Sequence, residues 1–346
     1  MRSRVGAEGS TAPGVLAAPA LRGPGSVAGI DVGGSSIKAV AILPSGEAAL
    51  HLREQTRAAG LVDQLCALAE RLGARAAAGG APLCALGLAV PGIVDEAAGI
   101  AAYSANLGWR DLAIVHLLEE RIGLPVRLGH DVRLGALAEG ILGAARDVTD
   151  YLFVPVGTGI AAALVLGGEP RRGAAGAAGE IGHLIVEADG PPCGCGQRGC
   201  LEAVASAAAI ARLYRARAGD GQADTADVCA RAQRGDARAE EVWRGAVAAL
   251  ARALAGAHAL VDLELIVLGG GLANAGALLV DQLAEAMQPV LGRLAPPRLR
   301  LAALGDEAAS LGAALYARGI RRVGPSAGGT LRHNGERDSP ACAAPT

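Results

Sequence analysis

The chain has 346 residues, a formal net charge of −2 and a hydrophobic content of 51%, with one Phe and two Trp. This length is sufficient for two domains with separate cores, and the nearly neutral charge does not favour binding to nucleic acid through bulk electrostatics. No apolar run approaches the roughly 20 residues that span a bilayer, so we expect a soluble, cytoplasmic protein.

Both ends of the chain are rich in Gly, Ala, Pro and Ser. Residues 1–26 lack a sustained hydrophobic period, and we expect a disordered N-terminal tail there. A signal peptide is the competing interpretation, because Arg2 and Arg4 precede a short apolar stretch, but prolines interrupt that stretch. Residues 322–346 are expected to form a disordered C-terminal tail.

The first ordered segment is predicted to be a strand, a glycine turn and a second strand over residues 27–43. The turn contains Asp31, Gly33, Gly34 and Ser35. Backbone N–H groups of such a turn can approach phosphate oxygens, and Asp31 could hold Mg²⁺ through water. An ordinary hairpin explains the same pattern equally well, so both interpretations stay open here.

Alternating helices and strands follow. Residues 60–79 have the period of an amphipathic helix, and residues 83–90 form a strand that ends before Gly92. After a loop that contains Asn106, Asp111 is expected to cap a helix that runs to about residue 122. A strand over residues 125–131 then leads into a helix from residue 132 to about 145. Asp131 is at that junction, where a helix cap is the favoured role and a general base is the alternative.

The second half repeats the strand–turn–strand design over residues 151–166, with Gly157, Thr158 and Gly159 at the turn. A buried strand over residues 264–268 precedes Gly269, Gly270 and Gly271, which leave room for a nucleoside or form a tight turn. Helices are also predicted at residues 203–218, 275–291 and 307–320, with two further helical segments between residues 218 and 260. A last strand is predicted at residues 299–304.

One histidine and three cysteines lie within eighteen residues, between Glu180 and Glu202. They are His183, Cys193, Cys195 and Cys200. Thiolates plus an imidazole are suitable ligands for tetrahedral Zn²⁺, and four protein ligands indicate a structural site. Free thiols or part of a disulfide framework are the alternatives. A metal clip would fix Glu180, His183 and Glu202 as a rigid surface for a ligand with several hydroxyl groups.

Together these motifs resemble the ROK family of sugar kinases and related repressors, within the actin/hexokinase/heat-shock-ATPase superfold. The similarity covers about residues 27–321, and its most specific part is Glu180-x-x-His183 with the cysteine cluster. It implies a two-domain α/β, ribonuclease H-like fold with an interdomain cleft. The small domain would comprise residues 27–132, completed by helix 307–321, and residues 133–306 would form the large domain.

The resemblance also implies a role for each motif. Asp131 would be the catalytic base, and His183 would bind both Zn²⁺ and sugar. The implied sugar-binding residues are Gly92, Asn106, His130, Asp131, Glu180, His183 and Glu202. The implied ATP- and Mg²⁺-binding residues are Asp31, Gly33, Gly34, Ser35, Lys38, Gly157, Thr158, Gly159, Gly269, Gly270 and Gly271.

One residue departs from the family pattern, which commonly has Asn where this chain has His130. A histidine is bulkier and can titrate near neutral pH, so it could change which hydroxyls are recognised or point away from the site. Catalysis through Asp131 would not require the asparagine.

The implied activity is ATP-dependent phosphorylation of a hexose at its 6-hydroxyl, with glucose as the first expectation. N-acetylmannosamine, N-acetylglucosamine or fructose could replace glucose, and polyphosphate could replace ATP. Candidates from another class are a non-catalytic sugar sensor and a ROK regulator without its DNA-binding domain, for which the N-terminal tail is too short. A homodimer or homotetramer is expected, with no nucleic-acid or membrane partner.

Overall fold

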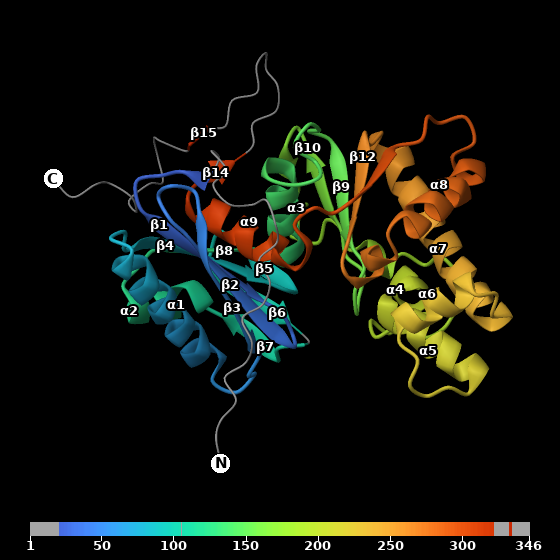
Figure 1. Cartoon of the computed structure of the whole chain (residues 1–346), viewed down its shortest axis with the longest axis horizontal. Coiled ribbons are helices and arrows are strands. Elements are labelled where there is room, and N and C mark those ends of the chain that lie inside the picture. The colour runs from blue at the N-terminus through green and yellow to red at the C-terminus, as the bar shows by residue number, and fades with distance from the viewer. Residues whose placement is uncertain (1–20, 105, 322–331, 334–346) are drawn as a thin grey trace.

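A computed structural model describes residues 21–104, 106–321 and 332–333. Two five-stranded sheets lie in separate lobes (Figure 1). The first sheet has the order β3-β2-β1-β4-β8, in which β1, β4 and β8 are parallel and β2 is antiparallel to both of its neighbours, β1 and β3. Its strands are β1 (Ser26–Val32), β2 (Ser36–Ile42), β3 (Ala48–Gln55), β4 (Leu83–Val90) and β8 (Val126–His130).

Helices cover both faces of this first sheet. Helices α1 (Leu61–Ala78) and α2 (Ile114–Ile122) lie on one face, where Ile30 and Val32 of β1 point. Helix α9 (Ala308–Ala317) lies on the other face with Val27. The alternating side chains of β1 therefore contribute to two cores, as expected of a strand buried on both sides.

The second sheet has the order β11-β10-β9-β12-β13. Its strands are β9 (Tyr151–Pro155), β10 (Ala163–Leu166), β11 (Glu169–Pro170), β12 (Leu265–Gly269) and β13 (Arg298–Leu301). The helices of this lobe are α4 (Leu201–Ala205), α5 (Ala207–Ala218), α6 (Thr225–Gln233), α7 (Ala237–Val261) and α8 (Ala277–Leu291). Short 3₁₀ segments are η2 (Ile181–His183), η3 (Gly271–Ala275) and η4 (Gly305–Glu307).

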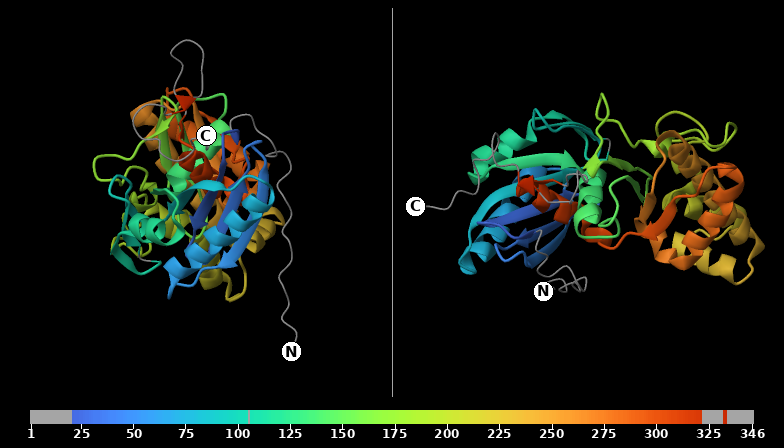
Figure 2. Two further views of the ribbon diagram at one scale, coloured as in Figure 1. Left: turned by 90° about the vertical axis from the view of Figure 1, so that its left-hand side faces the viewer. Right: turned by 90° about the horizontal axis from the view of Figure 1, so that it is seen from above.

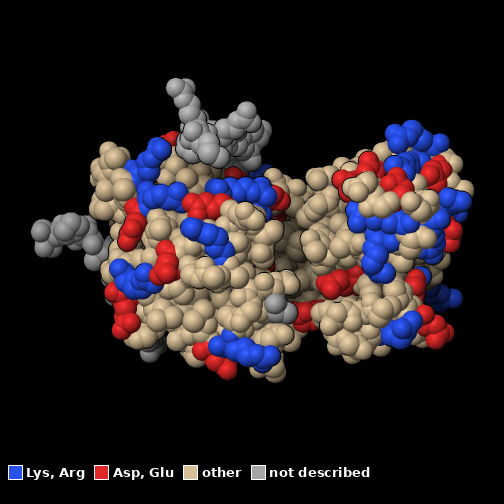
Figure 3. All heavy atoms as spheres, turned by 90° about the horizontal axis from the view of Figure 1, so that it is seen from below, with Lys and Arg blue, Asp and Glu red and all other residues tan. Residues whose placement is uncertain are grey.

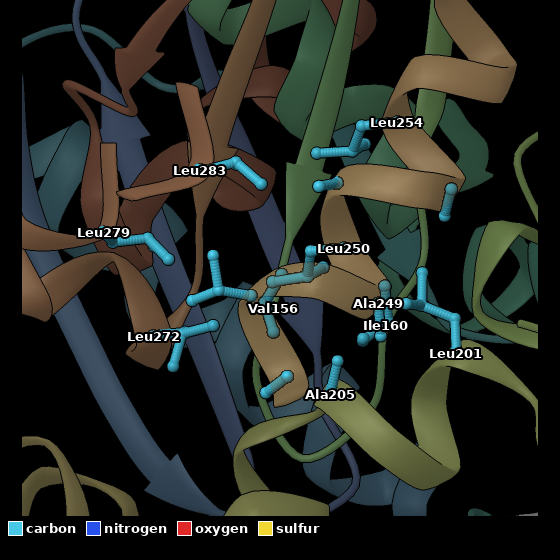
Figure 4. Close-up of a cluster of buried hydrophobic side chains, with 14 of the residues drawn as sticks. Val156, Ile160, Leu201, Ala205, Ala249, Leu250, Leu254, Leu272, Leu279 and Leu283 are labelled. Atoms are coloured by element: carbon cyan, nitrogen blue, oxygen red, sulfur yellow. The ribbon is translucent and has the colours of Figure 1, made fainter. Parts of the chain in front are cut away.

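The core of the second lobe supports the turn between β9 and β10. Val156 and Ile160, on either side of that turn, point into a cluster with Leu250 and Leu272 (Figure 4). Because both flanking side chains are buried, residues 157–159 are held in place while remaining partly accessible.

A third, three-stranded sheet extends from the first lobe and consists of β5 (Ile93–Asp95), β6 (Ile100–Ser104) and β7 (Trp109–Leu112). The prediction that Asp111 caps a helix is wrong. Residues 109–112 pair with β6, Asp111 has a φ of 45°, and the helix begins at Ile114. Pairing with β6 satisfies the backbone of residues 109–112 as a strand, so the helix begins only after Ala113.

Helix α3 (Asp131–Ile141) and the return segment at residues 302–307 join the two lobes, and α3 and α9 pack against each other between the sheets (Figure 2). Their contact is close, because a Cβ at Gly312 would lie 1.9 Å from the carbonyl oxygen of Leu134. Glu139 of α3 is fully buried and ties the two connections together. Its carboxylate accepts hydrogen bonds from the backbone N–H groups of Ala144 at 2.7 Å, Ala303 at 3.1 Å and Leu304 at 2.9 Å.

Two details at the chain ends correct the sequence prediction. Leu21, expected in a disordered tail, is fully buried in the cluster that contains α9, because it fills apolar space beside Val27 and Val40. Helix α9 ends at Ala317 rather than continuing to residue 321, where β14 (Ile320–Arg321) pairs with β15 (Arg332–His333). The rest of the predicted tails, residues 1–20, 322–331 and 334–346, lies outside the described residues.

The helices of the described ranges include none that is long and apolar enough to cross a membrane.

The two lobes meet along a hollow in the molecular surface (Figure 3). We propose that the domain boundaries follow the sheets as predicted, with residues 27–132 and α9 in one domain and residues 133–306 in the other.

Replacement of Glu139 should test the junction. We expect Glu139→Ala to lower the free energy of unfolding by about 3 kcal/mol, because three backbone N–H groups, of which that of Leu304 is buried, would lose their acceptor. Chemical denaturation measures this change. Glu285→Ala, which removes an exposed carboxylate from α8, is the control and should change stability little. Equal effects of the two substitutions would contradict this role of Glu139.

Candidate active site

The first glycine turn joins β1 to β2 and is fixed by backbone hydrogen bonds. The N–H of Gly33 donates to the carbonyl of Ser36 at 3.0 Å, and the hydroxyl of Thr56 donates to the carbonyl of Gly33 at 2.6 Å. Ser35 is exposed at the tip. The turn also lies against Asn106, because a Cβ at Gly34 would be 3.3 Å from the Cβ of Asn106.

The second and third glycine turns lie side by side. The N–H of Val156 donates to the carbonyl of Gly269 at 2.9 Å, and the N–H of Leu272 donates to the carbonyl of Val156 at 3.0 Å. Gly270 has a φ of 74°, and a Cβ there would lie 2.5 Å from the carbonyl oxygen of Val156. Only glycine fits this position without strain, and it allows the third turn to pack closely against the second.

Asp31, at the end of β1, carries a carboxylate in a mostly buried position. Burial raises its pKa to about 6, although the ammonium of Lys38, 3.8 Å away, opposes the shift. Lys38 also lies 3.7 Å from Asp306 of η4, which sequence reasoning did not identify. This part of the site therefore combines two carboxylates with one cation, a set that suits a magnesium-bound polyphosphate.

Asp131 is the first residue of α3 and directly follows β8. Burial, and then the nearby charge of Asp31, raise its pKa to about 7, and Glu180 raises it further. The N–H of Val132 donates to its Oδ1 at 2.7 Å. The carboxylate of Asp131 is thus within electrostatic reach of both the first glycine turn and the Glu180–His183 segment.

His130 is buried beside Asp131, with 7% of its surface exposed. Its Nδ1 is 3.2 Å from Oδ1 of Asp131 but has no hydrogen-bond partner among the described residues. Burial and the charge of Arg133 lower the pKa of His130 to about 3. The expectation of titration near neutral pH is therefore wrong: the imidazole stays neutral because the interior does not tolerate its charge.

Glu180, His183 and Glu202 form a polar corner next to the second turn. Glu180 precedes η2, and its Oε2 lies 3.9 Å from Nε2 of His183. Oε2 of Glu202 accepts a hydrogen bond from the N–H of Ile160 at 3.0 Å. Gly92 lies on the other side of the site, packed against the carbonyl of Tyr103.

The predicted metal ligands come together in the structure. One ligand atom from each of His183, Cys193, Cys195 and Cys200 lies within 4.8 Å of the others. Sγ of Cys193 is 3.8 Å from Nδ1 of His183, and Sγ of Cys195 is 3.6 Å from Sγ of Cys200. Two ligands on a tetrahedral ion with bonds near 2.3 Å are separated by about 3.8 Å, so the cluster could hold such an ion. The three thiols of the cluster are free.

A cavity of about 250 Å³ adjoins the third glycine turn, between α6 and η3. Sequence reasoning placed the turn but missed the other walls, because residues of α6 and α7 reach the cavity only through tertiary packing. The missed lining residues are Thr225, Ala226, Cys229, Ala230, Gln233, Trp243, Asn274 and Ala275.

Comparison with known proteins agrees with this arrangement. The sequence model described as "ROK family" matches residues 27–320. The chain belongs to the ROK family. The predicted family and two-domain actin-like fold are therefore confirmed, and the structure places the family's two sheets in separate lobes.

Individual relatives show which activities occur among similar proteins. The chain is 32% identical to a glucokinase of Halalkalibacterium halodurans, over 82% of this chain and 92% of that one. It is 33% identical to an N-acetylmannosamine kinase of Escherichia coli, over 84% of this chain and 97% of that one. The structure resembles a ROK family glucokinase of Streptomyces griseus in complex with glucose and AMPPNP, with a TM-score of 0.73, 29% identity and coverage of 85% of this chain and 99% of that one.

The raised pKa of Asp131 predicts two pH dependences with the same origin. If the carboxylate acts as a base, kcat/KM for sugar phosphorylation should fall as pH decreases through about 7.

In the folded protein the carboxyl binds a proton more tightly than in the unfolded chain, so its ionisation destabilises the fold as pH rises from about 4 to 7. Asp131→Asn should therefore increase the free energy of unfolding by roughly 2 kcal/mol above pH 7 and change it little below pH 4.

Denaturation curves at several pH values and a kinetic pH profile measure both effects. Asp111→Asn, at an exposed position in β7, is the matched control. A flat kcat/KM between pH 5.5 and 8 would be inconsistent with Asp131 as a base of raised pKa.

Proposed function

We propose that this chain is an ATP-dependent hexose kinase that phosphorylates the 6-hydroxyl, with glucose as the preferred substrate. The observation that carries the proposal is the position of Asp131, which lies near enough to Asp31 of the first glycine turn and to Glu180 for both charges to raise its pKa. A base for sugar phosphorylation must lie between the phosphate-binding turns and the groups that hold the sugar.

The proposed sugar site consists of Gly92, Asn106, His130, Asp131, Glu180, His183 and Glu202. Carboxylates and imidazole nitrogens can accept or donate hydrogen bonds to several hydroxyls at once. Nδ1 of His130 has no partner within the described structure, but the atom is buried, so it would reach a sugar oxygen only after its surroundings moved. Nε2 of His183 can face the sugar while Nδ1 faces the cysteines, because the two nitrogens lie on opposite sides of the ring.

The proposed nucleotide site uses the three glycine turns and the cavity beside them. Asp31, with Lys38 nearby, would hold the Mg²⁺ of Mg-ATP, and the cation would withdraw charge from the phosphoryl oxygens when bound. Backbone N–H groups at residues 33–35 and 157–159 would orient the phosphates, and the cavity at residues 269–275 would accept the base. The other residues of these turns, Gly33, Gly34, Ser35, Gly157, Thr158, Gly159, Gly269, Gly270 and Gly271, keep their predicted roles as proposals.

Catalysis then follows from the position of Asp131. Its carboxylate accepts the proton of the 6-hydroxyl while that oxygen attacks the γ-phosphorus in line. A pKa of about 7 leaves the carboxylate ionised above neutral pH and still basic enough to take a proton. Closure of the two lobes would exclude water, which competes with the sugar as acceptor.

Asp131→Asn should separate binding from chemistry. The amide keeps the shape of the side chain but cannot accept the proton, so we expect kcat to fall by about 10²–10⁴-fold. The sugar dissociation constant, measured by calorimetry, should remain nearly unchanged. ADP release with Mg-ATP, measured across glucose, mannose, fructose and the N-acetylhexosamines, would identify the substrate of the wild-type protein. Absence of turnover with every sugar, despite sugar binding, would contradict the kinase and favour the sensor.

N-acetylmannosamine remains the specific alternative, because an N-acetylmannosamine kinase is as similar in sequence as a glucokinase is. The same screen distinguishes the two. Polyphosphate as the phosphoryl donor is a further proposal, which is tested by replacing ATP with polyphosphate in the assay. Assembly into a homodimer or homotetramer is another, which light scattering tests directly.

We also propose that His183, Cys193, Cys195 and Cys200 hold a structural Zn²⁺. Three sulfur atoms and one imidazole nitrogen lie within 4.8 Å of one another, and three thiolates at this spacing would require a cation to balance their charge. All four ligands come from the protein, which leaves no position for a reacting water. The ion would connect η2 to the start of α4 and thereby fix His183 relative to Glu202.

Purified wild-type protein should contain about one zinc per chain by elemental analysis. Cys195→Ser should lose the metal and lower the melting temperature, and it should raise KM for the sugar more than KM for Mg-ATP, because the polar corner would no longer be held. Cys195 is exposed, so this substitution removes little packing. Cys66→Ala, outside the cluster, should retain the metal. A metal-free wild-type protein with an unchanged melting temperature would refute the site.

A further inference from the structure

An ionic triad with a buried centre connects the three-stranded sheet of the first lobe to the loop that precedes Glu180. Glu96, between β5 and β6, has a side chain that is only 10% exposed. Its Oε1 accepts from Nε and Nη2 of Arg133 at 3.2 and 3.0 Å, and its Oε2 lies 3.2 Å from Nε of Arg172. One carboxylate thus balances two guanidinium groups from different segments.

The third donor group of Arg133 extends the connection. Nη1 of Arg133 donates to the carbonyl of Gly176 at 3.1 Å, in the same loop as Arg172. Arg133 is itself 4% exposed, so its charge has no access to bulk water and depends on Glu96. The triad therefore holds residues 172–176 against both α3 and the β5–β6 connection.

The triad borders a cavity of about 170 Å³, which is also lined by Leu137 of α3, Glu169 of β11 and Tyr316 of α9. Next to this cavity, the ion pairs of Glu96 connect the loop directly to the first lobe. Charged groups in a poorly hydrated site interact more strongly than at an open surface.

The loop leads directly to the polar corner. The N–H of Ala178 donates to the carbonyl of Arg172 at 3.1 Å, and the N–H of Ala162 donates to the carbonyl of Gly179 at 2.8 Å. Glu180 follows immediately. A displacement of Arg172 would therefore be transmitted to Glu180 and His183 through a short, hydrogen-bonded stretch of backbone.

We propose that Glu96, Arg133 and Arg172 form an interdomain latch that positions Glu180 and His183 and so sets the affinity for the sugar. Glu96, Arg133 and Arg172 are positioning residues, which act through Glu180 and His183. The proposal rests on the proposed sugar site. In this proposal, the β5–β6–β7 sheet holds the large-domain side of that site in its binding geometry.

Arg172 offers the clean test, because its side chain is half exposed and its removal leaves the Glu96–Arg133 pair intact. Arg172→Ala should raise the sugar dissociation constant and the sugar KM by about five- to tenfold, with kcat and the KM for Mg-ATP changed less than about twofold. Arg172→Lys, which keeps the charge, should recover part of the affinity. The assay uses the full-length protein with the hexose that its wild type prefers.

Arg171→Ala is the matched control, since the neighbouring arginine is exposed and donates to the carbonyl of Leu166 rather than to Glu96. It should leave sugar affinity unchanged. Equal affinities in Arg172→Ala, Arg171→Ala and wild type would overturn the latch, as would an equal loss of Mg-ATP and sugar affinity. If the wild-type protein itself binds no hexose by calorimetry, the proposed function fails instead, so the two failures are distinguishable.

Discussion

The compensation of buried charge along α3 is the constraint on which the junction of the two lobes depends. Asp131, Arg133 and Glu139 occupy one short helix, and each is largely removed from water. A charge in such a position must find a partner, shift its pKa or destabilise the fold. Glu139 and Arg133 find partners, whereas Asp131 shifts its pKa. Each of the three residues links α3 to a different part of the chain.

Glu139 and Arg133 are compensated, whereas Asp131 is not. Glu139 accepts three backbone hydrogen bonds from the two connections between the lobes, and Arg133 pairs with Glu96. Asp131 receives one backbone hydrogen bond and faces other carboxylates, so its pKa rises. The two satisfied charges hold α3 in place, and this rigidity makes an unsatisfied charge tolerable at its first residue. Such a distribution is expected where binding and catalysis require a group that is costly for stability.

Features that depend on neighbouring residues alone were predicted correctly from the sequence. Glycine turns after apolar strands, the amphipathic period of residues 60–79 and the Cys/His spacing all led to the observed elements and to the observed metal-ligand cluster. The predicted cap at Asp111 failed because pairing with β6 determines the conformation there, and a single-sequence pattern does not specify strand partners. Leu21 was assigned to a tail because its neighbours are small and polar, although one leucine is sufficient to fill a gap beside α9.

The missed residues share a different cause. Glu96, Arg172 and Glu139 look like ordinary surface charges in the sequence. Only the pairing of segments 37 to 165 residues apart makes Glu96 and Glu139 interior groups, and Arg172 is recognised only through its contact with Glu96. The cavity lined by α6 and η3 was missed for the same reason. Family resemblance provided the roles of Asn106, Glu180 and Glu202, because none of them has a distinctive spacing by itself. How much affinity these residues contribute is a question of chemistry that the fold alone does not determine.

The neutrality of His130 connects the latch to the catalytic group. A protonated imidazole 3.2 Å from Asp131 would stabilise the carboxylate and lower its pKa, which would make it a weaker base. Burial and the guanidinium of Arg133 keep the imidazole neutral, with a pKa near 3. Arg133 itself lowers the pKa of Asp131, but less than burial and Asp31 raise it. Because Arg133 pairs with Glu96, the ion pair that holds the loop also fixes the guanidinium that helps to keep the imidazole neutral. In this chain, the connection between β5 and β6 therefore supplies the partner that holds Arg133 beside His130 and Asp131.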